Sequence, residues 1–271
     1  MGGLSYKGSP TGVVFGFLKQ VGELQETFRT PRVIFTFDHP KLYRKVVYPS
    51  YKQKRHSQER TEEEKLKFAA LHEQIQCLRA RYLPKIGFRN ILCWHGLESD
   101  DVMASLAKHR RPDQHFVLVT ADKDLWQMLR PGVEVWNPHS RVLHTHETFE
   151  EEHGIVPKDY ALVKAIAGCS TDEVEGIARV GEVTALKFLR GELKDTSSLY
   201  KKIRSREGKA IVRRNWPLVK LPFKGTPKAE FERDDFSNEG WLEVVDLLGF
   251  RSLEKRPPFW IQQEITHGKR W

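Results

Sequence analysis

The chain has 271 residues and 39% of them are hydrophobic, so it can form one large domain or two small ones around a real core. It has no apolar stretch of about 18 residues, and its start lacks the features of a secretory signal, so we expect a soluble, intracellular protein. Its 3 cysteines are widely spaced, which argues against a disulfide framework or a thiolate zinc site. The formal net charge of +9 favours a polyanionic partner such as nucleic acid.

Strands and helices alternate in the first half of the chain. Helical periodicity predicts helices at residues 12–24, 62–82 and 99–111. Runs of apolar residues predict buried strands at residues 33–37, 90–94, 116–120 and 133–137. This alternation is typical of an α/β fold with a mostly parallel central sheet and helices on both faces.

Helical patterns dominate from about residue 157 onward. Two predicted helices, at residues 158–168 and 181–191, are separated by a glycine-containing turn. The tail from residue 216 is rich in proline, charge and tryptophan, and it predicts only a short helix at 240–250. We therefore expect a helical subdomain after the α/β part.

Acidic side chains follow three of the predicted strands: Asp38; Glu98, Asp100 and Asp101; and Asp122 and Asp124. Ligands of open α/β sheets gather outside the carboxyl ends of the strands, so these carboxylates should converge. They would repel one another unless a divalent cation neutralised them, and ligation by oxygen alone points to Mg²⁺ or Mn²⁺. The alternative is that "SDD" caps a helix and "ADKD" forms a turn.

The same residues carry a resemblance to a known family. "GLESDDVMASLAKH" and "VLVTADKDLWQML" resemble the central motifs of the 5′ nuclease superfamily, in particular the phage flap endonuclease/5′→3′ exonuclease group and the 5′-nuclease domain of bacterial DNA polymerase I. The resemblance extends over "FDHP", "YKQKR" and "AIAGCSTDEVEGIARVGEVTALKFL", and so covers residues 10 to 225.

The resemblance implies a two-metal hydrolysis of DNA phosphodiesters at 5′ flaps, branches or ends, in replication or repair. It assigns one group of side chains to the first Mg²⁺ or Mn²⁺ ion and its surroundings, namely Asp38, Glu98, Asp100 and Asp101. It assigns a second group to the other ion, namely Asp122, Asp124 and Asp172. We further expect a monomer in the cytoplasm of a bacterium or a phage-infected cell.

The resemblance also divides the chain. It implies an α/β nuclease core over residues 1–150 with a helical arch at about 46–85, a helix-hairpin-helix subdomain over 151–225, and a C-terminal extension over 226–271. Two alternatives remain open. One is a module of the same fold that binds flaps or junctions without cleaving them, and the other is a PIN-like ribonuclease.

Two departures from the family pattern bear on the metals. The family begins with a strand that ends in an aspartate, and this first strand is missing, so we expect the native reading frame to continue upstream of Met1. The family's Gly-Asp-x-x-Asp stretch reads "GCSTD" here, with Cys169 in the first acidic position and Asp172 in the second. This replacement is expected to weaken the second metal site.

Two segments are expected to hold DNA. "GIARVGEVTALKFL" resembles a helix-hairpin-helix, whose amides bind a phosphate and whose carbonyls can hold K⁺; the residues concerned are Gly176, Arg179, Gly181 and Thr184. Arg179 replaces a family glycine there, and the alternative is an ordinary helical corner. "YKQKRHSQER" resembles the base of the arch, where Lys52 and Arg55 would approach the scissile phosphate and Tyr51 and Lys54 would also contact DNA. The alternative for this charged run is a solvated surface.

Overall fold

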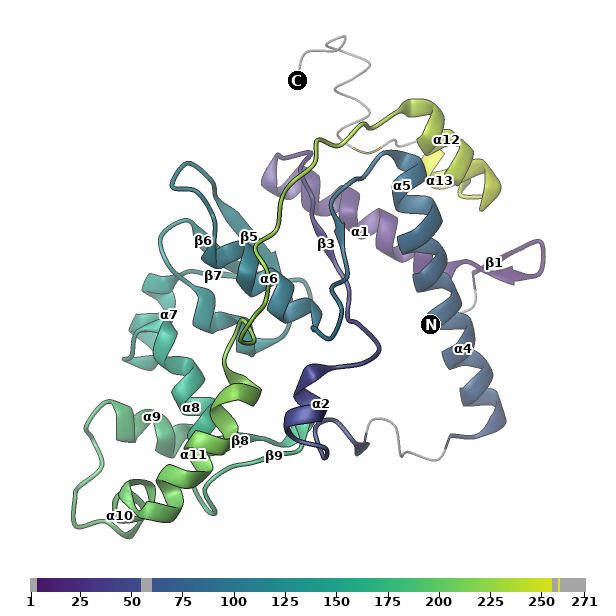
Figure 1. Ribbon diagram of the computed structural model, residues 1–271. Helices are drawn as coiled ribbons and strands as arrows, with labels where there is room; N and C mark the ends of the chain where they lie inside the picture. The colour runs from purple at the N-terminus through teal and green to yellow at the C-terminus, as the bar shows by residue number, and fades with distance from the viewer. Residues whose placement is uncertain (1–3, 55–59, 255–257, 259–271) are drawn as a thin grey trace. The chain divides into compact units, whose positions relative to one another are not determined.

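The computed structural model describes residues 4–54, 60–254 and 258. Contacts between residues group the chain into two units, whose helices and strands are labelled in Figure 1. Among the described residues, unit 1 comprises residues 4–35, 60–92, 230–254 and 258, and unit 2 comprises residues 36–54 and 93–229. Both units combine distant segments of the chain, so this grouping differs from the linear boundaries expected near residues 150 and 225, which stay a prediction.

Unit 1 is mainly helical. Its elements are β1 (Ser5–Tyr6), β2 (Ser9–Pro10), α1 (Gly12–Phe28), α4 (Glu62–Cys77), a π-helical turn (Leu78–Tyr82), α5 (Leu83–Ile86), β4 (Ile91–Leu92), α12 (Asn238–Leu247) and α13 (Arg251–Glu254). Thr61 and Glu64 form a capping box at the start of α4, which satisfies backbone amides that a helix start leaves unpaired. In the core of this unit, the ring of Phe88 packs 4.8 Å from that of Phe35 and 4.7 Å from that of Phe236.

Unit 2 contains the predicted acidic side chains. β3 (Phe35–Thr36) lies at its boundary with unit 1. The helices of unit 2 are α2 (Tyr43–Val47), α6 (Ser99–Lys108), α7 (His146–His153), α8 (Tyr160–Ala167), α9 (Glu182–Leu189), α10 (Ser198–Arg204) and α11 (Arg206–Val219), with 3₁₀ turns at Lys123–Met128, Pro157–Asp159 and Ser170–Asp172. Its strands are β5 (Phe116–Val119), β6 (Val133–Asn137), β7 (Val142–His144), β8 (Gly168–Cys169) and β9 (Val174–Glu175).

Strand pairing is partly as expected. β5 pairs with β6 in parallel, with Phe116 opposite Val133, and β6 pairs with β7 antiparallel. In the part of the chain that the structure describes, however, the strands fall into separate sheets of two or three strands. The α/β content is confirmed, whereas the single, mostly parallel central sheet and the missing first strand are not.

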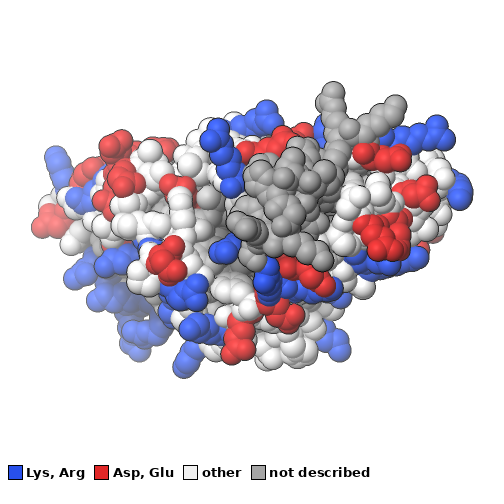
Figure 2. Space-filling view, turned by 90° about the horizontal axis from the view of Figure 1, so that it is seen from above, with Lys and Arg blue, Asp and Glu red and all other residues white. Residues whose placement is uncertain are grey.

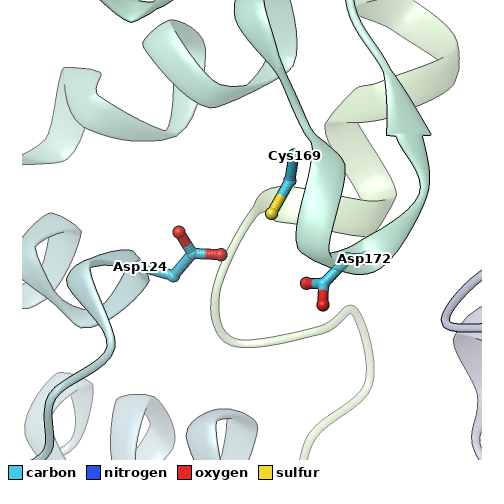
Figure 3. Close-up of side chains that lie close together, drawn as sticks. All are labelled: Asp124, Cys169 and Asp172. Carbon is cyan, nitrogen blue, oxygen red and sulfur yellow. The ribbon is translucent and has the colours of Figure 1, made fainter. Parts of the chain in front are cut away.

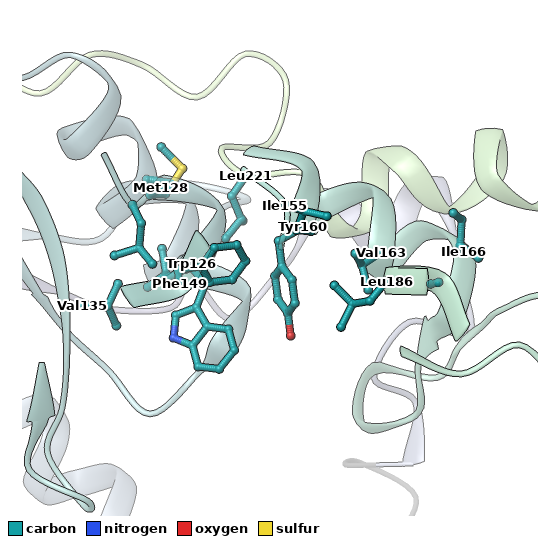
Figure 4. Packing of buried hydrophobic residues seen from close by; sticks show 14 of the residues in the cluster. Trp126, Met128, Val135, Phe149, Ile155, Tyr160, Val163, Ile166, Leu186 and Leu221 are labelled. Atoms are coloured by element: carbon teal, nitrogen blue, oxygen red, sulfur yellow. The ribbon is translucent and has the colours of Figure 1, made fainter. Parts of the chain in front are cut away.

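One hydrophobic core supports the site in unit 2. Trp126, Phe149, Tyr160 and Leu186 are among the buried residues that join the 3₁₀ turn after β5 to helices α7, α8 and α9 (Figure 4). The ring of Trp126 lies 5.5 Å from that of Tyr160. Because the turn that carries Asp122 and Asp124 is anchored in this core, their positions relative to α8 are fixed by packing.

Most predicted elements are present at nearly the predicted positions. The strand expected at 133–137 is β6 over the same residues, and the helix expected at 62–82 is α4 followed by the π-helical turn.

Within the described residues, no helix is long and apolar enough to cross a membrane.

Candidate active site

The start of α6 fixes the first group of acidic side chains. Glu98 is the N-cap of this helix, and its side chain forms a reciprocal capping box with Asp101. The backbone amide of Ser99 donates to Asp38 Oδ1 at 2.7 Å, which brings the acid after β3 to the same helix start. The capping alternative holds only in part, because Glu98 rather than "SDD" supplies the N-cap and Asp101 accepts a hydrogen bond from the Glu98 amide.

Asp101 has a different partner from the metal that was expected. It is fully buried beside Arg44, whose guanidinium donates to both of its carboxylate oxygens. The backbone amides of Glu98 and Phe223 donate to the same two oxygens at 3.2 and 2.7 Å. Because its carboxylate accepts four hydrogen bonds, Asp101 stabilises the fold.

Asp100, by contrast, accepts no hydrogen bond from the residues that the structure describes. Burial, together with the negative charges of Asp122, Glu98 and Asp38, raises the pKa of its carboxyl to about 8. These three acids thus lie near enough to Asp100 to oppose its ionisation. Within the described residues, however, the side chains whose ligand atoms lie within 4.8 Å of one another are Asp124, Cys169 and Asp172. A hard divalent cation would relieve that repulsion, and an all-oxygen set of this kind fits Mg²⁺ or Mn²⁺.

The second group of acidic side chains lies around the 3₁₀ turn after β5. Asp122 caps this turn by accepting from the amide of Asp124 at 2.8 Å. Asp124, Cys169 and Asp172 point toward one another, and each offers one ligand atom within 4.8 Å of the others (Figure 3). Lys164 Nζ lies 2.8 Å from Asp124 Oδ1. Burial raises the pKa of the Asp124 carboxyl and also that of the Cys169 thiol.

Lys52 and Tyr51 connect the two acidic groups. Lys52 Nζ forms an ion pair with Glu98 and lies 3.6 Å from Asp172 Oδ1. The hydroxyl of Tyr51 donates to Glu98 Oε2 at 2.9 Å, and its side chain is only 3% exposed. The expected contact of Tyr51 with DNA bases is therefore not supported, because its ring is enclosed by protein. The role of Lys52 toward a phosphate stays a prediction.

The other arch residues are only partly described. The amide of Lys54 donates to Glu173 Oε2 at 2.6 Å, and its side chain is exposed. Arg55 lies outside the described residues. The arch itself thus stays a prediction.

The segment that resembles a helix-hairpin-helix runs between α8 and α9. Gly176 packs so closely against the carbonyl of Ala167 that an added Cβ would collide with it. Arg179 is exposed and has φ of 69°, a left-handed conformation that favours glycine. Arg179 stands in place of a glycine of the family pattern, and its backbone is therefore strained.

The start of α9 has no side-chain cap, and Glu182 lies in its first turn. Gly181 is its N-cap and supplies no capping side chain, and Thr184 lies in its first turn. Lys202 Nζ donates to the carbonyl of Ala178 at 2.9 Å, so one carbonyl of this hairpin already has a cationic partner. Binding of phosphate and K⁺ at the hairpin both stay predictions.

A basic face on α10 and α11 was missed in the sequence. Its exposed side chains are Lys201, Arg204, Arg206, Lys209 and Arg213. On α11 the last three follow helical spacing and share one side of the helix. On the face drawn in Figure 2, both Lys and Arg side chains and Asp and Glu side chains lie at the surface. The excess of Lys and Arg over the whole chain was visible in the sequence, but this local grouping could have been found only by plotting charge along the helices.

Comparison with known sequences identifies the family. Residues 4–154 match the model of the 5′-3′ exonuclease N-terminal, resolvase-like domain. The chain is 32% identical over 188 residues to a 5′-3′ exonuclease of Bacillus subtilis, covering 68% of this chain and 60% of the relative. It is 26% identical over 237 residues to a 5′-3′ exonuclease of Buchnera aphidicola, covering 86% of this chain and 74% of the relative. The chain therefore belongs to the 5′-3′ exonuclease family, and the 5′ nuclease superfamily expected from its motifs is confirmed.

Solved structures agree on the fold. A T5 5′-exonuclease with bound divalent metal ions (zinc) has a TM-score of 0.66 and 20% sequence identity, with 79% of this chain and 83% of that chain covered. A bacteriophage T5 flap endonuclease in a complex with DNA and metal ions has a TM-score of 0.65 and 20% identity, with 89% of this chain and 86% of that chain covered. At this identity the likeness shows the 5′ nuclease fold.

Proposed function

We propose that this protein is a divalent-metal-dependent, structure-specific 5′ nuclease that hydrolyses DNA phosphodiesters at 5′ flaps or ends, in DNA replication or repair. The observation that carries the proposal is that Asp124, Cys169 and Asp172 bring ligand atoms within 4.8 Å of one another, while the charges of Asp38, Glu98 and Asp122 oppose the ionisation of Asp100. Repulsion among these carboxylates does not stabilise the fold. It does favour the binding of a cation, which neutralises their charge. Family membership and the DNA and metal ions in the T5 flap endonuclease complex support the same reaction.

The carboxylates have distinct parts in this proposal. Asp38, Glu98 and Asp100 would hold one Mg²⁺ or Mn²⁺ ion, and Asp122, Asp124 and Asp172 would hold a second divalent ion. Bound divalent ions would supply an activated water and neutralise the charge that develops on the phosphate. Asp101 belongs to neither set, because Arg44 occupies both of its oxygens.

Lys52 would act on the phosphate itself. Its ammonium group lies between Glu98 and Asp172, so it is positioned beside both proposed ion sites. Its ammonium group would stabilise the negative charge that develops on the phosphate.

The DNA duplex would be held at a distance from the cleaved bond. The hairpin before α9 offers backbone amides to a phosphate, and the basic face of α10 and α11 offers exposed cations. Contacts of this kind position a duplex without reading its sequence, as expected for a nuclease that recognises DNA structure.

Cleavage of a labelled 5′-flap DNA, measured over a titration of Mg²⁺ or Mn²⁺, tests the proposal. We expect cleavage near the base of the flap, none in EDTA, and binding without cleavage in Ca²⁺. A matched RNA flap is the control for a PIN-like ribonuclease, and we expect it to be cut more slowly. Tight flap binding with no cleavage in any divalent ion would instead favour the binding module of the same fold.

A further inference from the structure

The three side chains of Figure 3 form a mixed donor set of one thiol and two carboxylates. Asp124 comes from the 3₁₀ turn after β5, Cys169 from the end of β8, and Asp172 from the 3₁₀ turn that follows it. Their ligand atoms lie within 4.8 Å of one another, close enough for one metal ion to contact all three. The sulfur thus lies where an oxygen ligand was expected.

The position of Cys169 is fixed by its surroundings. It pairs with Val174 across the β8–β9 ladder and packs in a small buried cluster with Ala165 and Leu218. Its Sγ lies 3.0 Å from Thr171 Oγ1. The sulfur therefore cannot turn away from the two carboxylates without disturbing packed neighbours.

Asp124 contributes a buried carboxylate to this donor set. Its Oδ1 is buried and accepts no hydrogen bond of good geometry, although Lys164 Nζ lies 2.8 Å away as an ion pair. The ion pair with Lys164 uses one acceptor position of this carboxylate, and its other lone pairs can accept a metal ion.

We propose that Cys169 binds the second divalent ion through its sulfur, together with Asp124 and Asp172, and shifts this site toward thiophilic ions such as Co²⁺ and Zn²⁺ and away from Mg²⁺. The thiol releases its proton to solvent when the bond to the metal forms. Thiolate ligands select such ions, whereas carboxylates, carbonyls and water suit Mg²⁺. The proposal rests on the proposed metal-dependent function and adds which ion the second site takes.

Co²⁺ is the probe, because a cobalt–thiolate bond gives a near-ultraviolet absorption band that oxygen ligands do not give. The reference protein carries Cys77→Ser and Cys93→Ser, so that Cys169 is its remaining thiol. We expect the band to grow with added Co²⁺ and to be absent when Cys169→Ser is introduced. Failure of Co²⁺ to bind in calorimetry, or binding without the band, overturns the proposal.

Cys169→Asp in the same reference protein tests the selectivity. We expect the Mg²⁺ concentration that gives half of the melting-temperature shift to fall by at least about tenfold, because an oxygen ligand replaces sulfur. An unchanged preference between Co²⁺ and Mg²⁺ shows that Cys169 does not set the selectivity.

Failure of this inference is distinguishable from failure of the proposed function. The absorption band is read without DNA, whereas the function is tested by cleavage of the 5′ flap. A band without cleavage in Mg²⁺, Mn²⁺ or Co²⁺ would leave the sulfur ligand in place and reject the nuclease.

Discussion

Arg44 and Asp101 form a buried ion pair in which Nη2 of the arginine lies 2.8 Å from Oδ1 of the aspartate. The side chains are 3% and 0% exposed. Arg44 also donates to Glu98 Oε2 at 3.0 Å and to the carbonyl of Leu218 at 2.9 Å. The arginine thereby connects α2 to the acidic start of α6 and to the end of α11. Because it pairs with Asp101 and not with Asp100, these two neighbouring aspartates have different roles.

Asp100→Asn and Asp101→Asn should therefore have opposite effects. Loss of one partner from a buried pair typically lowers the free energy of unfolding by about 3–5 kcal/mol, so we expect that cost for Asp101→Asn. Asp100→Asn removes an unpaired acid from a crowded group, and we expect unchanged or higher stability in EDTA, with cleavage reduced at least about a hundredfold. Urea unfolding and single-turnover cleavage of the same preparations measure both. Equal stability of the two variants would contradict the assignment.

The metal-free protein should lose stability as the pH rises. The pKa of Asp100 is about 8 in the folded chain against 3.8 when unperturbed, so between these values the unfolded chain has released a proton that the folded chain keeps. Stability then falls with pH across this window, because the folded state binds more protons. Melting temperatures in EDTA should show this fall, and Asp100→Asn should make it shallower. Added Mg²⁺ should restore stability most at the alkaline end.

Replacement of Asp122 or Asp124 by Asn should abolish most cleavage while sparing DNA binding. Each change removes a carboxylate of the proposed ion sites, and we expect cleavage to fall at least about a hundredfold, more than about 2.7 kcal/mol of barrier. Flap binding in Ca²⁺, measured by fluorescence anisotropy, should persist. Cleavage near the level of the unaltered protein in both variants would reject the metal assignment.

Lys52 and Arg179 should affect different steps. Lys52→Ala should slow single-turnover cleavage far more than it weakens duplex binding, because a phosphate charge near the metals matters most in the transition state. Arg179→Ala should weaken duplex binding and reduce the slope of log K against log salt by about one, since it removes about one phosphate contact. Alanine keeps the left-handed strain at this position, so the comparison isolates the side chain. A Lys52→Ala variant with weaker affinity and an intact rate would contradict its role.

The basic face of α10 and α11 should contribute to duplex affinity independently of cleavage. We expect the triple change of Arg206, Lys209 and Arg213 to Gln to reduce the salt slope of duplex binding by about two to three, at about 0.9 per phosphate contact. A matched control changes three exposed bases of unit 1, Lys19, Arg29 and Arg32, to Gln. It alters the net charge equally, so an equal loss of affinity in the control would show a general charge effect.

The sequence determined the local elements and the identity of the family. The β-branched run before Asp122 and the alternation at 133–137 specified β5 and β6, because strand periodicity is a local property. The acids at 98–101 and 122–124 were found for the same reason, since each group lies within a few residues of an element's end. The motifs that resemble those of the 5′ nucleases are likewise short contiguous stretches of the sequence.

Only the tertiary structure decided which partner each of those acids has. Arg44 is 57 residues from Asp101 in the chain and reads in the sequence like any other surface cation. Cys169, which looked like a lost ligand, lies beside Asp124 and Asp172 because β8 and the 3₁₀ turns meet in the folded chain. Partnerships of this kind depend on long-range packing around a shared core, and the spacing of residues along the sequence carries no information about them.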